Sequence, residues 1–236
     1  LPIATVKLQK ETLNTRTAHG RWYRDACGTA FAMEVLGERW SLLVIRELML
    51  GGRRFSDLRA SLPGISAKVL TERLESLEAA GVVTRRRLPS PGKVQIYELT
   101  EWGYRAEPAI QELGRWAAMS PDHDPLLPLS PVSFMLSLRT MFDPAKAVRL
   151  EARIGFAIAG ENFVAQLTDG TMTIARESAF DGVDAAFHAP QAPLLAALFY
   201  ANIPPEELEG SGLVIAGDRA RALAFAGIFE LPDKIA

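Results

Sequence analysis

The chain has 236 residues, of which 48% are hydrophobic and 23% charged, and its formal net charge is −2. This is an ordinary globular composition at a length that favours two domains. The sequence has no run of about 18 uncharged apolar residues, so it predicts no membrane span. Because the N-terminus lacks the apolar core of a signal peptide, we expect a cytoplasmic protein. The single cysteine, Cys27, excludes an internal disulfide framework and a multi-cysteine metal site.

Charge and proline content divide the chain. Residues 1–120 hold 18 Lys and Arg against 13 Asp and Glu, a balance of +5, while the remainder holds 8 against 15, a balance of −7. A basic first part favours a polyanionic partner. The four prolines in residues 120–131 interrupt helices and strands alike. We therefore expect a first domain over residues 1–119, a linker over 120–131 and a second domain over 132–236.

Helical patterns follow one another in the first part. They cover residues 26–37, 39–50, 54–64 and 65–81. The second pattern is apolar around most of its circumference, which is typical of a buried central helix. Ser56 is the candidate N-cap of the third helix and Ser66 that of the fourth, which Gly81 is expected to end.

A β-hairpin and a last helix complete the first part. Strand-like runs at 82–88 and 94–100 are joined by Pro-Ser-Pro-Gly-Lys, and a helical pattern covers 101–119. A short helix that braces a second helix, followed by a hairpin, is the order of a winged helix-turn-helix. In that arrangement the second helix enters the major groove, about 12 Å wide, and the hairpin lies along the DNA backbone.

The surface that these elements predict is basic. The residues expected to contact bases or phosphates of double-stranded DNA are Arg53, Arg54, Ser66, Lys68, Thr71, Arg73, Arg85, Arg87 and Lys93. Arg86 completes a run of three arginines, whose alternative interpretation is a solvated strand face. Glu72 and Glu75 restrict phosphate contact on the fourth helix, although a carboxylate can accept a hydrogen bond from cytosine.

The same segment carries a recognisable set of motifs. They are Cys27, Gly37-Glu38-Arg39-Trp40, Arg46-Glu47-Leu48, Arg54-Phe55-Ser56-Asp57-Leu58, Leu62-Pro63-Gly64-Ile65-Ser66, Leu70 with Arg73-Leu74, Leu77-Glu78-Ala79-Ala80-Gly81 and Tyr97-Glu98-Leu99-Thr100. Together they resemble the HxlR family of bacterial transcription regulators over residues 24–118. The resemblance implies a homodimer joined through terminal helices, with the third helical element of the motif reading DNA. One departure is Gly28, since the family often has proline after the cysteine.

The resemblance also gives Cys27 a candidate role. A cysteine at this position, thirteen residues before Trp40, can act in the family as a thiol or aldehyde sensor. Arg21 and Arg24 lie upstream, and nearby cations favour a reactive thiolate. The alternative is an inert, small hydrophobic side chain. Because the chain has no second cysteine, only an intersubunit or mixed disulfide can form.

The second part mixes helical and strand patterns. An apolar helical run covers 134–142, strand-like runs cover 149–160, 161–170, 171–178 and 183–190, and a helix at 191–208, a strand at 212–217 and a helix at 218–229 follow. Asp169-Gly170 is a hairpin signal. The expected class is α+β, with a small antiparallel sheet and helices on one of its faces.

A second resemblance concerns this part. The element order, Thr168-Asp169-Gly170, residues 189–198 and 212–217, and Asp218 with Arg219 resemble the sterol-carrier-protein domain over residues 130–236. The resemblance implies an apolar tunnel between sheet and helices that holds a hydrophobic small molecule. Candidate lining residues are Phe134, Leu138, Met141, Phe142, Phe156, Leu195, Leu198, Phe199 and Phe225. The alternative for each is plain core, with the tunnel filled by side chains.

Neither part shows a catalytic or metal-binding motif. Residues 210–217 lack the spacing of a dinucleotide fingerprint, and the histidines His19, His123 and His188 lack metal-ligand spacing. We expect no enzyme, no cofactor and no metal. The sequence predicts a homodimeric DNA-binding regulator controlled by a hydrophobic small molecule in the second domain. The alternative is a carrier or enzyme-like protein for an apolar molecule, with the helical part as its dimerisation module.

Overall fold

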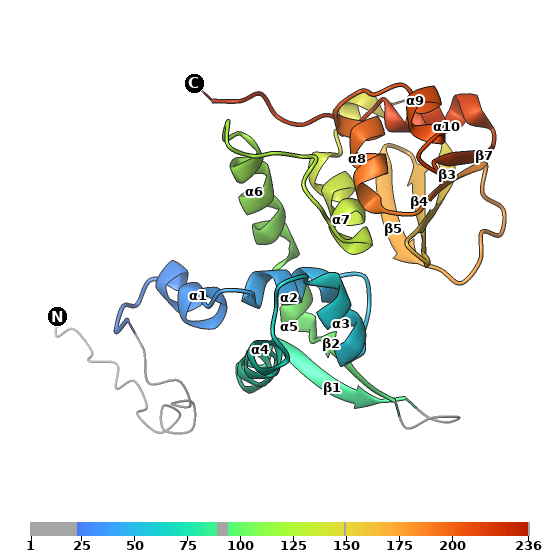
Figure 1. The fold of residues 1–236 in the computed structure, drawn as a ribbon. Coiled ribbons are helices and arrows are strands. Elements are labelled where there is room, and N and C mark those ends of the chain that lie inside the picture. The colour runs from blue at the N-terminus through green and yellow to red at the C-terminus, as the bar shows by residue number, and fades with distance from the viewer. Residues whose placement is uncertain (1–22, 89–93, 149, 236) are drawn as a thin grey trace.

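The N-terminal half combines helices with a two-stranded wing (Figure 1) in the computed structural model, which describes residues 23–88, 94–148 and 150–235. Its elements are α1 (Gly28–Leu36), α2 (Ser41–Leu48), α3 (Phe55–Ser61), α4 (Ala67–Ala79), β1 (Val83–Arg87), β2 (Gln95–Leu99), α5 (Glu101–Tyr104) and α6 (Glu107–Ala118). β1 and β2 pair antiparallel, with Val83 opposite Leu99. The order α3, α4, wing is that of a winged helix-turn-helix, as the sequence predicts.

Local sequence sets both ends of α4. The Ser66 hydroxyl accepts a hydrogen bond from the Val69 N–H at 3.2 Å and caps the helix. Gly81 has a φ of +78°, a conformation that glycine adopts without a steric penalty just after a helix. Both expectations for this helix are confirmed.

The prediction that Ser56 caps α3 is wrong. Arg54 is the N-cap, and the Ser56 hydroxyl lies inside the first turn, where it donates to Asp57 at 3.1 Å. The preceding residue, Arg53, is paired with Tyr97 of β2 through two backbone hydrogen bonds of 2.8 Å. The helix therefore begins directly after this bridge.

The helix expected over residues 101–119 is two helices. α5 ends at Tyr104 and α6 begins at Glu107. Pro108 has no N–H to donate to the carbonyl of Tyr104, and its ring would clash with that carbonyl in a continuous helix. At the second position of α6 the same proline is tolerated, because N–H groups in the first turn have no intrahelical partner.

The C-terminal half is a five-stranded sheet with helices. Its elements are α7 (Pro131–Met141), the 3₁₀ turn η2 (Pro144–Lys146), β3 (Ala152–Ile158), β4 (Glu161–Thr168), β5 (Thr171–Arg176), β6 (Ala185–Ala189), α8 (Ala192–Tyr200), α9 (Pro205–Glu209), β7 (Val214–Gly217) and α10 (Arg219–Ala226). The strand order is β5-β4-β3-β6-β7. Residues 119–130, between the two halves, contain no helix or strand.

The sheet is mixed, whereas the sequence predicts an antiparallel one. β3 and β6 are parallel, and the other neighbours are antiparallel. Residues 177–184 connect β5, at one edge of the sheet, to β6. β6 pairs with β3 on the side opposite β4 and runs parallel to β3. Gly155 of β3 makes room for this connection, since a Cβ there would lie 3.0 Å from the Phe180 ring. Strand patterns gave no sign of this crossover.

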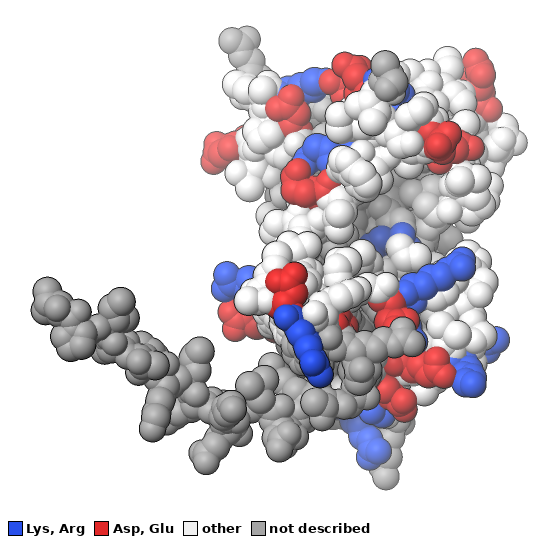
Figure 2. Space-filling view, turned by 90° about the vertical axis from the view of Figure 1, so that its left-hand side faces the viewer, with Lys and Arg blue, Asp and Glu red and all other residues white. Residues whose placement is uncertain are grey.

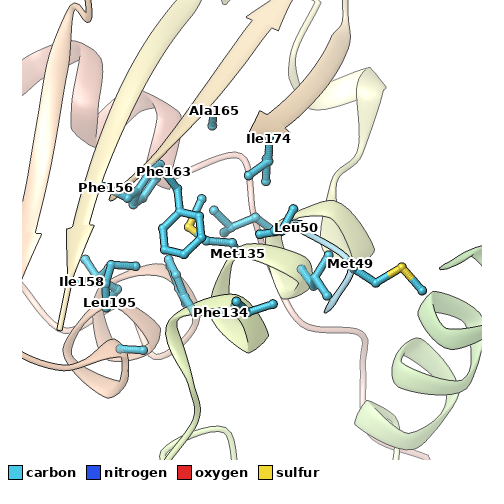
Figure 3. Close-up of a cluster of buried hydrophobic side chains, with 14 of the residues drawn as sticks. Met49, Leu50, Phe134, Met135, Phe156, Ile158, Phe163, Ala165, Ile174 and Leu195 are labelled. Carbon is cyan, nitrogen blue, oxygen red and sulfur yellow. The ribbon is translucent and has the colours of Figure 1, made fainter. Parts of the chain in front are cut away.

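One apolar core joins the two halves. Phe156 of β3 lies within 6.2 Å, between ring centroids, of Phe134 of α7, Phe199 of α8 and Phe225 of α10, so these three helices cover the same face of the sheet. Figure 3 shows that the core continues past α7 to Met49 and Leu50, the two residues that follow α2. The C-terminal half is therefore packed on the helix-turn-helix rather than tethered to it.

Candidate nucleic-acid interface

The outer face of α4 presents one lysine, short polar side chains and the carboxylates of Glu72 and Glu75 to solvent. Lys68 is 85% exposed, and its ammonium lies 4.0 Å from Glu72. Thr71 is exposed and donates to the Ala67 carbonyl at 3.0 Å. The opposite face buries Leu70, Leu74 and Leu77. α4 thus keeps one stripe in the core and leaves the other free to enter a groove.

Arg73 does not belong to that free stripe. Its side chain is 16% exposed and pairs with Glu38 at 3.0 Å, and Glu72 lies 3.8 Å away. The pair fastens α4 to the turn between α1 and α2. The expectation that Arg73 contacts DNA does not fit this geometry, because the guanidinium is turned toward the protein and is already paired.

The wing places its three arginines on two faces. Arg85 donates to Glu78 at 2.7 Å, and this hydrogen bond raises the pKa of Arg85. Arg86, on the other face of the strand, pairs with Glu98 at 2.9 Å. Arg87 is exposed and forms no ion pair with any described residue. The expected contact Lys93 lies outside the described residues.

Two adjacent arginines before α3 have opposite environments. Arg54 is exposed and makes no ion pair within the described ranges. The Arg53 side chain is 8% exposed, with Nη2 2.9 Å from Glu161 and Nη1 3.8 Å from Glu47. The backbone bridge to Tyr97 directs the Arg53 side chain into the junction between the two halves. The Arg53 side chain is therefore buried and paired within the protein, which does not fit the expected contact with phosphate.

Glu47 is the functional candidate that sequence reasoning missed. It is fully buried, and its Oε1 accepts hydrogen bonds from Arg46 at 2.9 Å and from the Ser130 hydroxyl, at the start of α7, at 2.7 Å. Oε2 has no hydrogen-bond partner among the described residues. The sequence signal for this site was the adjacent pair Arg46-Glu47 inside an otherwise apolar helix, because a buried carboxylate requires a partner.

Most of the proposed tunnel residues form packed core. Phe134, Leu138, Phe156, Leu195, Leu198, Phe199 and Phe225 are buried. Neighbouring rings meet edge to face, as Phe134 and Phe199 do at 5.3 Å between centroids. Met141 and Phe142 are half-buried. For the seven buried residues the geometry is that of the core alternative, so a ligand among them would have to displace aromatic contacts.

A cavity lies beside this core. It has a volume of about 280 Å³ and lies between α6, α7 and α8, with Met141, Ile110 and Tyr200 in its wall. Burial raises the pKa of the Tyr200 phenol, whose oxygen lies 2.6 Å from the Ser137 hydroxyl. Most of the wall is apolar, and its polar part combines hydroxyls with the charged side chains of Arg46 and Glu107.

Cys27 is exposed and immediately precedes α1. Hydrogen bonds from the backbone of Ala30, and then of Thr29, lower the pKa of its thiol. The first turn of a helix therefore stabilises the thiolate, where the sequence argument invoked arginines. Arg21, one of those arginines, lies outside the described residues.

Two negative findings concern the described residues alone. They contain no group of three or more His, Cys, Asp or Glu side chains that could hold a metal ion. None of their helices is both long enough and apolar enough to cross a bilayer.

Known proteins match the N-terminal half. The family described as HxlR-like helix-turn-helix matches residues 35–124. The uncharacterized HTH-type transcriptional regulator YvaP of Bacillus subtilis is 40% identical over 87 residues, which are 36% of this chain and 80% of YvaP. The HTH-type transcriptional regulator YodB of the same organism is 42% identical over 86 residues, 36% of this chain and 77% of YodB. The structure of reduced YodB matches with 37% identity and a TM-score of 0.39, covering 42% of this chain and all of YodB. The chain belongs to the HxlR-like helix-turn-helix family.

Proposed function

We propose that this protein is a homodimeric transcription regulator that reads double-stranded DNA with α4 and holds its backbone with the β1–β2 wing. Its role as a DNA-binding regulator follows from its family. The residues that perform it, the dimer and control by a ligand are our proposals. The observation that carries the site is the exposed stripe of α4, with Lys68 and Thr71 outside and three leucines inside.

A dimer is supported by apolar side chains left exposed on the last helices of the N-terminal half. Trp116 is 70% exposed and Leu113 47% on α6, Trp102 of α5 is also exposed, and Met33 is an exposed apolar residue of α1. On the side of the molecule that carries α1 and α6, charged side chains are scattered and much of the surface is uncharged (Figure 2). Covering Trp116 and Leu113 with a second copy removes them from water. Two α4 helices then meet half-sites about 34 Å apart.

Control by a hydrophobic small molecule rests on the C-terminal half. A small sheet with α7, α8 and α10 on one face supports the sterol-carrier-like interpretation. The cavity beside Met141 and Tyr200 borders α6, the proposed dimer helix, and is where such a molecule can enter without opening the aromatic core. The molecule must bind the DNA-competent and the incompetent geometry with different affinity, since equal affinity shifts neither population.

The test is a fluorescence-anisotropy titration with the DNA upstream of the protein's own gene, at several salt concentrations. Arg87→Ala should weaken binding to all sequences and reduce the slope of log affinity against log salt by about 1. Lys68→Ala should instead narrow the difference in affinity between that DNA and a scrambled duplex. Arg219→Gln, an arginine paired with Glu206 and Glu209 in the C-terminal half, is the matched control and should change neither.

Two results would refute the assignment. If Lys68→Ala and Arg87→Ala bind as the Arg219→Gln control does, the DNA-binding surface lies elsewhere on the chain. If the wild-type protein shows no preference for any natural upstream DNA over scrambled duplex, the carrier interpretation takes precedence.

A further inference from the structure

Residues 230–235, which we call the strap, run from the C-terminal half back to the end of α6 (Figure 1). The strap follows Phe229, whose ring belongs to the aromatic core and lies 5.1 Å from that of Phe225, between centroids. At the other end of the strap, the Ile235 N–H donates to the carbonyl of Met119, the C-cap of α6, at 2.9 Å. The strap therefore joins a fixed point in one half to the end of a helix in the other.

Lys234 caps α6 from this distant segment. Its ammonium donates hydrogen bonds to the backbone carbonyls of Ala118 and Ser120 at 2.9 Å and of His123 at 3.1 Å. A lysine ammonium has three N–H donors, so each of them has a partner. The last carbonyls of a helix lack intrahelical partners and carry the negative end of the helix dipole, where a cation is stabilising. The cap is long-range, since Lys234 follows Ala118 by 116 positions.

The strap holds the part of α6 that other hydrogen bonds leave free. Near the start of α6, Glu107 pairs with Arg139 of α7 at 2.7 Å. Farther along, the Arg115 side chain donates to the Thr140 carbonyl. Beyond Arg115, the hydrogen bonds that connect α6 and its C-cap to the C-terminal half come from the strap, as far as the described residues show. The last turn of α6 therefore depends on the strap for its position.

That last turn belongs to the proposed dimer surface. Trp116 lies in it and is 70% exposed. The strap also borders the cavity of about 280 Å³, where Leu231 lies in the same wall as Ile110 and Gly114 of α6. A molecule in the cavity would contact the strap and the dimer helix together, and this link to a ligand rests on the proposed function.

We infer that Lys234 is a positioning residue, through which the C-terminal half holds the end of α6 in the orientation that dimer formation requires. The family match ends at residue 124, so the strap belongs to the half of the chain that the match does not cover. A helix end that is already ordered loses less conformational entropy when a second copy binds it. Loosening the strap therefore weakens the dimer without changing the apolar side chains that the two copies cover. The dimer is part of the proposed function, whereas the cap on α6 is independent of it.

The first experiment is amide hydrogen exchange of the full chain, followed by mass spectrometry. Lys234→Met keeps an unbranched stem but removes the three donors, and because Lys234 is exposed the change leaves the core intact. Exchange in residues 115–123 should become about fivefold faster, since the last turn of α6 loses its cap. Exchange in α4 and α8 should stay as in the wild type.

The second experiment is sedimentation equilibrium, which measures the dimer dissociation constant of the same proteins. Lys234→Met should raise this Kd about fivefold, because dimer formation must then order the end of α6. Lys234→Arg keeps the charge and N–H donors, so its Kd should lie closer to that of the wild type. Lys146→Met is the matched control. It removes the same charge from an ion pair with Glu230, at the other end of the strap, and exposed pairs of this kind contribute little.

The inference is wrong if residues 115–123 of Lys234→Met exchange at the wild-type rate. It is also wrong if their exchange accelerates while the dimer Kd stays the same, or if Lys146→Met weakens the dimer as much as Lys234→Met does. In the last case the loss of any positive charge explains the result, and the cap on α6 does not.

The same proteins separate this inference from the proposed function. If the variants behave as expected but the wild-type dimer ignores specific DNA, the positioning role is right and the regulatory role is wrong. If DNA binding is specific and Lys234→Met dimerises like the wild type, the reverse holds. A wild-type protein that stays monomeric at every concentration overturns both the proposed dimer and the positioning role.

Discussion

The adjacent residues Arg53 and Arg54 allow stability and DNA binding to be separated in one pair of variants. Arg53→Met keeps an apolar stem in the junction but removes the charge next to Glu47, which is fully buried. Removing one partner of a buried ion pair costs about 3 to 5 kcal/mol, because the other charge stays buried without compensation. Glu161 is partly exposed and Glu47 keeps Arg46 and Ser130, so the lower end, about 3 kcal/mol, is expected.

The assay is urea unfolding followed by far-UV circular dichroism, with the free energy taken from transitions of equal slope. Arg54→Met, at the exposed neighbour, should change the free energy of unfolding by no more than about 0.5 kcal/mol while weakening DNA binding. The double variant Glu47→Gln/Arg53→Met should be more stable than Arg53→Met alone, since it removes the orphaned charge. A loss below about 1 kcal/mol in Arg53→Met, or a double variant less stable than the single one, would refute the buried-pair reasoning.

Three further changes test the dimer, the sheet crossover and the cysteine. Trp116→Asp places a charge on the exposed face of α6 and should convert a dimer to a monomer in analytical ultracentrifugation; an unchanged sedimentation coefficient contradicts the proposed interface. Gly155→Ala brings a Cβ to 3.0 Å from the Phe180 ring and should lower the free energy of unfolding by about 1 to 3 kcal/mol, with no loss expected if residues 177–184 do not cross there. Because the pKa of Cys27 is lowered, its thiolate persists to lower pH than that of a free cysteine. The iodoacetamide alkylation rate should therefore reach half its maximum at a lower pH than the rate of an unstructured cysteine peptide measured alongside, and an equal or higher midpoint contradicts the effect of the helix.

Sequence patterns succeeded where the cause of a structure is local. The cap at Ser66 and the helix end at Gly81 depend on residues within one turn, so they are readable from the chain alone. The two wing strands and β3 to β5 follow from alternation and turn residues in the same way. The break after Tyr104 was also local, and Pro108 was the signal that the helical pattern concealed.

Tertiary partners decided the sites that sequence patterns misplaced. Arg53 and Arg54 are chemically identical neighbours, and only the strand bridge to Tyr97 sends one inward and leaves the other exposed. Arg73 has the spacing of a DNA-facing residue, yet Glu38, 35 positions earlier in the chain, turns it toward the protein. The parallel pairing of β3 with β6 was likewise invisible, because a strand pattern carries no information about its neighbour's direction.

The junction explains why a ligand anywhere near α7 can matter to DNA. α2 packs against both α7 and α4, so the same helix touches the C-terminal half and supports the DNA-facing helix. Met49, Leu50 and Met135 belong to one close-packed core. Such a core changes between discrete packing arrangements and does not deform continuously. A ligand that favours one arrangement by about 1.4 kcal/mol changes the ratio of the two tenfold. The buried cluster around Glu47 lies at this boundary, and its incompletely bonded Oε2 and the Arg53 Nη1 opposite it are the atoms that a second arrangement can satisfy differently.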